Sequence, residues 1–133
     1  MLIKGIILNK PFHLSFVVPD LRLTQAFYIN ILDCKKGRDT GQWLDIIFFG
    51  HQLTLHQEST TMAAQAIDHF GVILNQREWL SLITKLKTAN IAFELEPSEK
   101  LNDDNSQAGK FAVKDPANNL LEFKFYQPAS INS

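Results

Sequence analysis

The chain has 133 residues, of which 45% are hydrophobic and 20% are charged, and its formal net charge is -1. This length favours a single domain with its own core. The balanced charge provides no basic field that would attract nucleic acid or an anionic membrane. The single cysteine, Cys34, excludes an intrachain disulfide and fits a reducing compartment. We expect Cys34 to be a small core or loop residue.

The first residues of the chain contain an apolar stretch that is too short for a signal peptide or a membrane span. We therefore expect a soluble cytoplasmic protein. An apolar strand at residues 12–18 is ended by Pro19 and Asp20, and a helix capped by Asp20 or Thr24 follows. We expect the buried face of this helix to carry residues spaced four apart, namely Leu23, Phe27 and Ile31. The next expected elements are a short polar strand or turn at 35–40, strands at 42–49 and 52–57, and a polar link at 58–66.

The pattern then restarts with a strand at 68–74. Asn75 and Glu78 stand in the N-cap and N3 places of a capping box, which predicts the start of a second helix. Its apolar face is expected to consist of Trp79, Leu82, Ile83 and Leu86. The remaining expected elements are a strand at 91–95 closed by Pro97, a mobile loop at 98–109 that could act as a lid, and strands at 110–113 and 120–126.

A strand–helix–strand–strand–strand order therefore occurs twice, with a spacing of about 55 residues. This predicts an α+β protein of βαβββ modules, one at residues 11–58 and the other at 67–127, within a single domain over residues 1–133. One face of each sheet would pack on a helix. The other face can curl around a cavity.

Polar side chains stand on the face of three strands that points away from the apolar residues. Because strand side chains alternate between faces, His13, His69 and Glu122 all point to the same side. His13 and His69 hold equivalent places in the repeat, and Thr54 falls in the slot equivalent to Glu122. Two histidines and a carboxylate can occupy one face of a divalent metal ion and leave other positions open. Such an ion would also compensate a Glu122 carboxylate that is otherwise buried without a positive partner.

The alternative from the residues alone is ordinary: histidines satisfied within the core or rim of a sheet, and a glutamate that faces solvent. Both interpretations stay open at this point.

Three segments of the chain resemble the vicinal oxygen chelate superfamily, which includes glyoxalase I, bleomycin-resistance proteins, fosfomycin-resistance proteins and extradiol dioxygenases. They are HLSFVVPDLRLTQAFYINILDC, DHFGVIL and DPANNLLEFKFY. The resemblance covers about residues 11–127 and is strongest to a glyoxalase/dioxygenase-like subgroup. It implies two modules that form a half-open barrel. It also implies His13, His69 and Glu122 as ligands of one divalent metal ion, for which Fe(II) is favoured and Zn, Ni, Mn or Co are alternatives.

The sequence departs from the family pattern at two positions. Asn118 stands where the closing turn of the family often has glycine, and asparagine tolerates the left-handed backbone of such a turn. Thr54 stands where metal-dependent glyoxalase I has a fourth ligand, usually glutamate, and this disfavours glyoxalase I activity. His56 would replace that ligand only if the register slipped by two residues.

Other residues are candidates for the site. His56 is a possible general acid or base, or else a rim histidine bonded to backbone. Lys124 shares the face of Glu122 and would bind an anionic substrate, unless it is simply a solvated lysine. The substrate-pocket candidates are Thr54, Lys124, Arg38, Trp43 and Tyr126.

These patterns favour a small metal-dependent enzyme that acts on a small oxygen-chelating organic substrate at a dioxygenase-like, three-ligand site. The alternatives are a metal-free drug-binding or small-molecule-binding protein like the bleomycin-resistance members, and a glyoxalase-like isomerase or lyase. We expect a small-molecule substrate, no nucleic-acid or membrane partner, and a homodimer.

Overall fold

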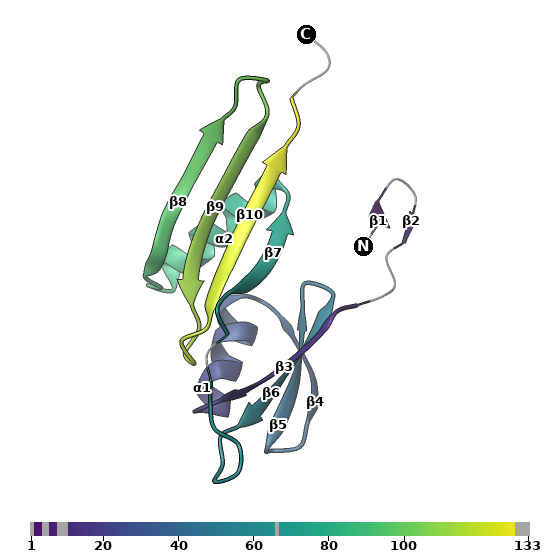
Figure 1. Cartoon of the computed structure of the whole chain (residues 1–133), viewed down its shortest axis with the longest axis vertical. Coiled ribbons are helices and arrows are strands. Elements are labelled where there is room, and N and C mark those ends of the chain that lie inside the picture. Colours follow the sequence, from purple (N-terminus) through teal and green to yellow (C-terminus); the bar gives the residue numbers. More distant parts are fainter. Residues whose placement is uncertain (1, 4–5, 8–10, 66, 130–133) are drawn as a thin grey trace. The chain divides into compact units, whose positions relative to one another are not determined.

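The computed structural model describes residues 2–3, 6–7, 11–65 and 67–129. The chain divides into two compact units, residues 1–65 and residues 66–133. Figure 1 labels the helices and strands of each unit. A short antiparallel pair, β1 (Leu2–Ile3) and β2 (Ile6–Ile7), precedes the first module.

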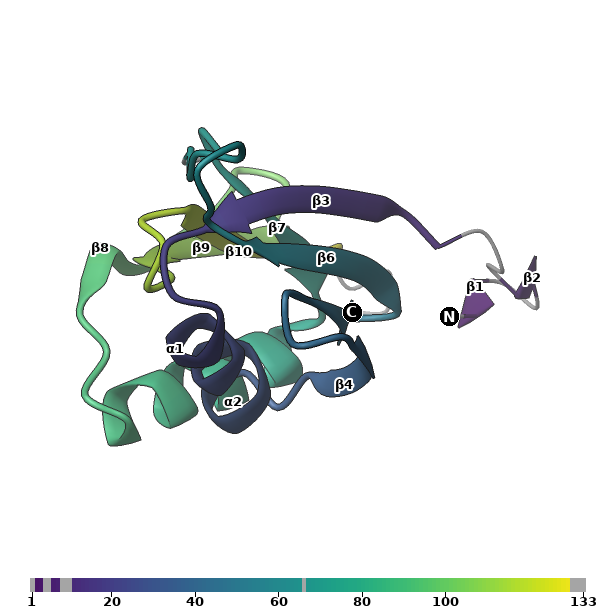
Figure 2. The ribbon, with the colours of Figure 1, turned by 90° about the horizontal axis from the view of Figure 1, so that it is seen from below.

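The first unit contains a four-stranded sheet and one helical segment. Its elements are β3 (His13–Val18), α1 (Leu21–Ala26), the π-helical turn η1 (Phe27–Ile31), β4 (Lys35–Asp39), β5 (Trp43–Phe48) and β6 (His51–Gln57). The strand order is β3-β6-β5-β4, in which β3 and β6 are parallel and the other neighbours antiparallel. Within this unit α1 lies against one face of the sheet (Figure 2).

The second unit repeats this arrangement. Its elements are β7 (Phe70–Leu74), α2 (Gln76–Thr88), β8 (Phe93–Leu101), β9 (Gln107–Lys114) and β10 (Leu120–Gln127). The strand order is β7-β10-β9-β8, and again only the first and last strands of the module pair in parallel. The two sheets therefore have the same order and the same directions, which confirms the α+β fold of two βαβββ modules. None of the helices in the described part of the chain is long and apolar enough to cross a membrane.

The first helix begins as expected, and of its expected buried face Phe27 is buried and Ile31 half-buried, whereas Leu23 is not. Asp20 is its N-cap, and its carboxylate accepts a hydrogen bond of 3.0 Å from the backbone N–H of Leu23. The Leu23 side chain is 56% exposed, so its expected place in the core is wrong. Leu21 and Thr24 are buried instead. A threonine can take this place because its hydroxyl donates a hydrogen bond of 2.8 Å to the carbonyl of Asp20 and is thereby satisfied.

The second helix agrees with its sequence signal. Asn75 Oδ1 accepts a hydrogen bond from the N–H of Glu78 at 2.8 Å, and Glu78 Oε1 accepts one from the N–H of Asn75 at 3.1 Å, which completes the capping box. All the residues expected on its apolar face are buried, namely Trp79, Leu82, Ile83 and Leu86. Trp79 donates its indole N–H to the carbonyl of Phe123 at 3.0 Å, which fastens α2 to β10.

The expected end of a strand at Pro97 and the expected loop at 98–109 are both wrong. Strand β8 continues to Leu101, and β9 begins at Gln107, so a tight hairpin replaces the mobile lid. Proline is tolerated here because β8 is an edge strand and its register with β9 shifts between Leu95 and Ser98. At the tip, Asp104 Oδ1 accepts a hydrogen bond of 2.9 Å from the N–H of Ser106.

The turn before β10 fixes the start of that strand. Asn118 has a positive φ of 68°, which confirms that it takes the left-handed place in the turn. Asp115 Oδ1 accepts hydrogen bonds from the N–H groups of Ala117 and Asn119 at 2.9 and 2.8 Å. Asn119 Oδ1 in turn accepts the N–H of Ile67 at 2.7 Å. The turn therefore also holds the segment that leads into β7.

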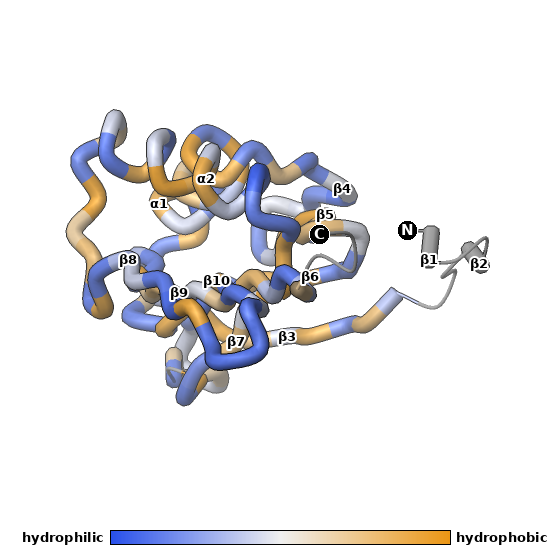
Figure 3. Tube along the Cα trace, turned by 90° about the horizontal axis from the view of Figure 1, so that it is seen from above, coloured by the Kyte–Doolittle hydropathy of each residue, from blue (hydrophilic) through white to orange (hydrophobic). Residues whose placement is uncertain are grey.

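Each sheet has one apolar face and one mixed face. The alternation of hydrophobic and hydrophilic residues is visible along β3 in Figure 3. In β10 it appears as burial of Leu121, Phe123 and Phe125, while Glu122 and Lys124 are only half-buried. Gly71 of β7 lies directly beside Glu122, and a Cβ atom at Gly71 would overlap the carbonyl oxygen of Glu122.

We predict that Gly71→Ala lowers the free energy of unfolding by about 2–3 kcal/mol, because a backbone carbonyl in a paired strand cannot move aside. Gly41→Ala is the matched control. Gly41 has a φ of 90° with open space around it, so that change costs only the left-handed backbone penalty of about 1 kcal/mol. Urea denaturation of both variants measures the difference. Equal stability of the two variants would contradict the close approach of β7 and β10.

Candidate functional site

The face of the first sheet that is turned away from the apolar core carries polar side chains in rows across the strands. The registers define three rows: His13, Gln52 and Ile47; Ser15, Thr54 and Asp45; Val17, His56 and Trp43. His13, Thr54, His56 and Trp43 were all expected on this face, and the structure places them there together with Asp45.

His13 is held by a neighbour in its own row. Its Nδ1 lies 2.6 Å from the side-chain oxygen Oε1 of Gln52. An Nδ1–H donor matches this amide oxygen, and Nε2 is then the ring nitrogen left to bind a ligand or a metal ion.

Glu122 lies in β10, in register with Gly71 of β7. β7 begins at Phe70 and not at residue 68 as expected, so His69 is exposed in the segment directly before that strand. The Nδ1 atom of His69 lies 2.8 Å from Oδ2 of Asp68, a contact of the kind that orients a ligand histidine.

Glu122 is not unpaired, and the expectation that it lacks a positive partner is wrong. Lys124 Nζ lies 3.2 Å from Glu122 Oε1, and the Glu122 side chain is 25% exposed. The hydrogen bond to Glu122 raises the pKa of Lys124. The two residues share a face because they are two apart in β10. This contact involves only one carboxylate oxygen of Glu122, so Oε2 is the oxygen that could bind another group.

Thr54 occupies the slot that corresponds to Glu122. Ser15 pairs with Thr54 in the first module as Gly71 pairs with Glu122 in the second. The Thr54 hydroxyl donates a hydrogen bond of 2.8 Å to Asp45 Oδ1, and Thr54 is buried. The proton of this hydroxyl is therefore already used in a hydrogen bond to a carboxylate.

Asp45 is the functional-site candidate that sequence reasoning missed. It is 3% exposed, and its Oδ2 accepts a hydrogen bond of 2.7 Å from Nε of Arg38. Burial works to raise the pKa of the Asp45 carboxyl, but the hydrogen bonds from Thr54 and Arg38 outweigh burial and leave that pKa below its usual value. The sequence signal was available: a carboxylate inside the apolar run WLDIIF, the same feature that singles out Glu122.

The other candidate residues are arranged less tightly. The His56 ring lies 6.4 Å from the Trp43 ring, and Tyr126 is 57% exposed at the end of β10. His51 provides a contrast with His13 and His69, because its Nδ1 accepts the N–H of Phe12 at 2.8 Å. The proton of His51 is therefore on Nε2, the opposite tautomer.

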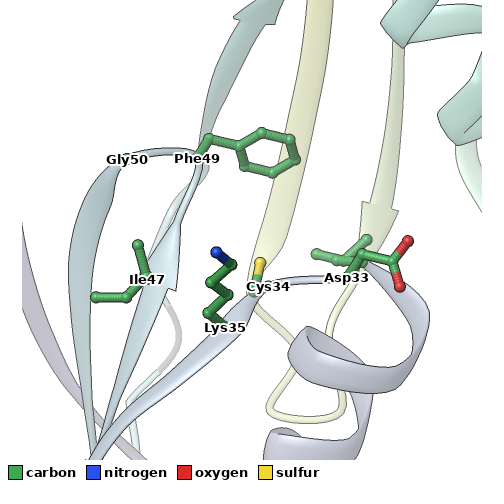
Figure 4. A pocket seen from close by; sticks show the side chains of 7 residues that line it. Asp33, Cys34, Lys35, Ile47, Phe49 and Gly50 are labelled. Atoms are coloured by element: carbon green, nitrogen blue, oxygen red, sulfur yellow. The ribbon is translucent and has the colours of Figure 1, made fainter. Parts of the chain in front are cut away.

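A separate pocket lies at the end of the β5–β6 hairpin (Figure 4). Its volume is about 280 Å³, and it is lined by Leu32, Asp33, Cys34, Lys35, Ile47, Phe49 and Gly50. Cys34 is buried, as expected for a core or loop residue. Burial, assisted by the charge of Asp33, raises the pKa of the Cys34 thiol to about 12. None of the expected site residues lines this pocket.

Among the described residues, no three His, Cys, Asp or Glu side chains come together as a metal-binding cluster. His13 belongs to the first unit, and the pair of His69 and Glu122 belongs to the second.

Comparison with known proteins identifies a family. A family model described as the Glyoxalase/Bleomycin resistance protein/Dioxygenase superfamily matches residues 10–123. A glyoxalase/bleomycin resistance protein/dioxygenase from Alicyclobacillus acidocaldarius is similar at 30% identity and a TM-score of 0.73, over 89% of this chain and 92% of that chain. No curated protein shows significant sequence similarity to the chain.

More distant solved structures share the fold alone. A lactoylglutathione lyase from Agrobacterium tumefaciens has 17% identity and a TM-score of 0.65, over 88% of this chain and 93% of that chain. A genomically encoded fosfomycin resistance protein from Listeria monocytogenes has 14% identity and a TM-score of 0.69, over 90% of this chain and 94% of that chain.

We predict that Cys34 is inert toward thiol reagents in the folded protein. A thiol with a pKa of about 12 is thiolate in only about one part in ten thousand at pH 8. Reaction with an aromatic disulfide reagent should be at least about a hundredfold slower in buffer than in urea. Equal rates in the two solvents would show that Cys34 is accessible and ionised.

We also predict that Asp45 contributes to the acid sensitivity of the fold. Its pKa is lower in the folded chain, so its stabilisation is complete above the unfolded pKa of about 4 and is lost as the pH falls through the folded value. Asp45→Asn should therefore flatten the fall in unfolding free energy below pH 4. The exposed change Asp103→Asn serves as the control, and urea denaturation between pH 2.5 and 6 measures both slopes. An unchanged slope in Asp45→Asn would refute this role.

Proposed function

Because the chain belongs to the glyoxalase/bleomycin resistance protein/dioxygenase superfamily, we propose that it is a small metal-dependent enzyme acting on an organic substrate that chelates through neighbouring oxygens. His13, His69 and Glu122 would hold one divalent metal ion. The observation that carries this proposal is a contact that the two histidines share. In both, Nδ1 lies within hydrogen-bond distance of a side-chain oxygen, so Nε2 is the nitrogen left to bind a metal ion.

The donor set fits such an ion. Two neutral imidazoles and one carboxylate suit Fe(II) best among the common ions when positions must stay open, and Zn, Ni, Mn or Co are alternatives. When bound, the ion would supply Lewis-acid or oxygen-activating chemistry. Gln52 and Asp68 would orient the two rings, since each lies within hydrogen-bond distance of a ligand histidine. Lys124 contacts Oε1 of Glu122 and leaves Oε2 for the ion.

His56 is our candidate for proton transfer. It lies on the same face of the first sheet as His13, in the row with Val17 and Trp43. Its imidazole is a side chain of the kind that transfers a proton as a general acid or base.

The state of Thr54 disfavours a glyoxalase I reaction. Thr54 has the place of a fourth ligand, but its hydroxyl is a neutral donor that is already bonded to Asp45. A three-ligand, dioxygenase-like site is the better match to the side chains present.

A second candidate is a metal-free binding protein of the bleomycin-resistance kind. One observation favours it: the Glu122 carboxylate already has a positive partner in Lys124, so no metal ion is needed to compensate it. Metal content separates the two candidates.

We predict about one equivalent of divalent metal in protein purified without oxygen and reconstituted with Fe(II). His69→Ala and Glu122→Gln should each lower metal affinity at least about tenfold, since each removes a ligand. His51→Ala is the matched control, because His51 has the opposite tautomer and should leave metal content unchanged. Elemental mass spectrometry after dialysis measures all four proteins. Absence of metal from the reconstituted parent would favour the binding protein.

The expected homodimer gives this experiment a second arm. Equal amounts of His13→Ala and His69→Ala are mixed, and metal binding is measured again. Half of the dimers are then heterodimers, each with one intact shared site of two, so recovery of about a quarter of the parent capacity would assign the ligands to two copies of the chain. No recovery would assign them to one.

A further inference from the structure

An irregularity in β4 turns an arginine onto the polar face of the first sheet. The pairing of β4 with β5 runs from Lys36 opposite Ile46 to Asp39 opposite Leu44, with a register shift between them. Gly37 and Arg38 therefore share one partner, Asp45. This is a β-bulge, a device that re-aims side chains and is frequent beside active sites.

Glycine is required at the first position of this bulge. A Cβ atom on Gly37 would lie 2.9 Å from the Cβ of Asp45, which is closer than such atoms approach. The bulge thus brings the backbone of β4 against the buried carboxylate. Arg38 is the next residue, and its side chain reaches the same carboxylate.

Asp45 fixes one edge of the Arg38 guanidinium. Arg38 Nε donates to Asp45 Oδ2 at 2.7 Å, and the Asp45 side chain is only 4% exposed, against 74% for Arg38. Thr54 holds the other carboxylate oxygen at 2.8 Å. The carboxylate that holds this edge of the guanidinium is therefore itself buried and bonded at both of its oxygens.

Trp43 fixes the plane of the group. The guanidinium carbon of Arg38 lies 5.0 Å from the centroid of the Trp43 ring, within the range of a cation–π contact. Arg38 is thus held along one edge and over an aromatic ring. Its outer nitrogens, Nη1 and Nη2, have no hydrogen-bond partner within residues 11–65 and 67–129. Arg22 differs, because its Nη1 and Nη2 both bond to Asp39.

We propose that Arg38 is a preformed binding site for the carboxylate of a small ligand, which it takes end-on through Nη1 and Nη2. Two parallel N–H donors in a fixed plane match the two oxygens of a carboxylate. Asp45 offsets the charge of Arg38, so affinity comes from geometry rather than from net charge. We expect dissociation constants for a simple carboxylate on the order of millimolar.

The site also restricts the substrate of the proposed enzyme, an extension that rests on the function proposed above. Arg38 and His13 act on one face of the same sheet. The carboxylate that holds Arg38 is on β5, two strands from β3, which corresponds to about 10 Å at ordinary strand spacing. The substrate class is therefore an extended anion, with its carboxylate at the end away from the chelating oxygens.

The test uses metal-free protein, so that it does not depend on the metal site. Benzoate and its neutral analogue benzamide are titrated into the full chain labelled with ¹⁵N-arginine, and the side-chain Nε and Nη signals are followed. Benzoate should shift the Arg38 signals with a dissociation constant at least about fivefold lower than that of benzamide. Equal effects of the two probes would overturn the proposal.

Variants of Arg38 distinguish binding through two parallel N–H donors from attraction by the positive charge alone. Arg38→Gln should weaken benzoate binding at least about fivefold, and Arg38→Lys should restore little of the loss, because an ammonium lacks the planar fork. Arg77→Gln is the matched control, since Arg77 is exposed on α2 in the other unit. Full recovery in Arg38→Lys, or equal loss in Arg77→Gln, would overturn the proposal. Thermal unfolding verifies that each variant is folded.

Two further arms decide the ligand and the role of Asp45. Inorganic phosphate should compete with benzoate only weakly; tighter binding of phosphate would overturn the assignment to carboxylates.

Asp45→Asn should broaden or shift the Nε signal of Arg38 and weaken benzoate binding, as expected for a positioning residue. Unchanged binding and an unchanged Nε signal would show that Asp45 does not orient Arg38. The metal titration of His69→Ala proceeds separately, so either proposal can fail alone.

Discussion

The parallel pairing of the first and last strands of each module decides which side chains become neighbours. It places Ser15 beside Thr54 in one module and Gly71 beside Glu122 in the other. The two pairs occupy equivalent positions but differ in chemistry. In the second module the last strand itself carries the carboxylate. In the first module the last strand carries a hydroxyl, and the carboxylate is on the adjacent strand as Asp45. The repeat therefore offers two acidic positions on equivalent faces, only one of which is accessible enough to serve as a ligand.

Pairing of carboxylates with a basic side chain of the same unit is a second common feature. Glu122 is paired with Lys124, Asp45 with Arg38, and Asp39 with both Arg22 and Lys36. The cost of a buried, unpaired charge explains why such partners are present. A metal ion or an anionic ligand would thus join an existing pair rather than fill an electrostatic gap. Binding would then depend on the donor atoms left over: Nε2 of the histidines, Oε2 of Glu122, and the outer nitrogens of Arg38.

The sequence predicts the repeat, the capping box and the left-handed turn at Asn118 because each depends on local chemistry. It does not predict the burial of Thr24 in place of Leu23, which depends on a hydroxyl bonding back to its own helix. The continuation of β8 past Pro97 depends on a register shift with β9, and the orientation of Arg38 depends on a bulge against β5. Both are properties of a pair of strands and not of either strand alone. The contacts at Nδ1 of His13 and His69 are likewise made by neighbours that strand alternation does not identify.

Pro97 has a further consequence for the behaviour of the protein in solution. β8 is a nine-residue strand at the end of its sheet, and within the described residues its outer edge pairs with no other strand. Such an edge is a template for strand addition by another molecule, which leads to aggregation. Here proline removes one backbone donor, the register shift bends the ladder, and exposed charges follow the strand at Glu94, Glu96, Glu99 and Lys100. We therefore expect Pro97, which ends the strand too early in a prediction from sequence, to disfavour strand addition at this edge.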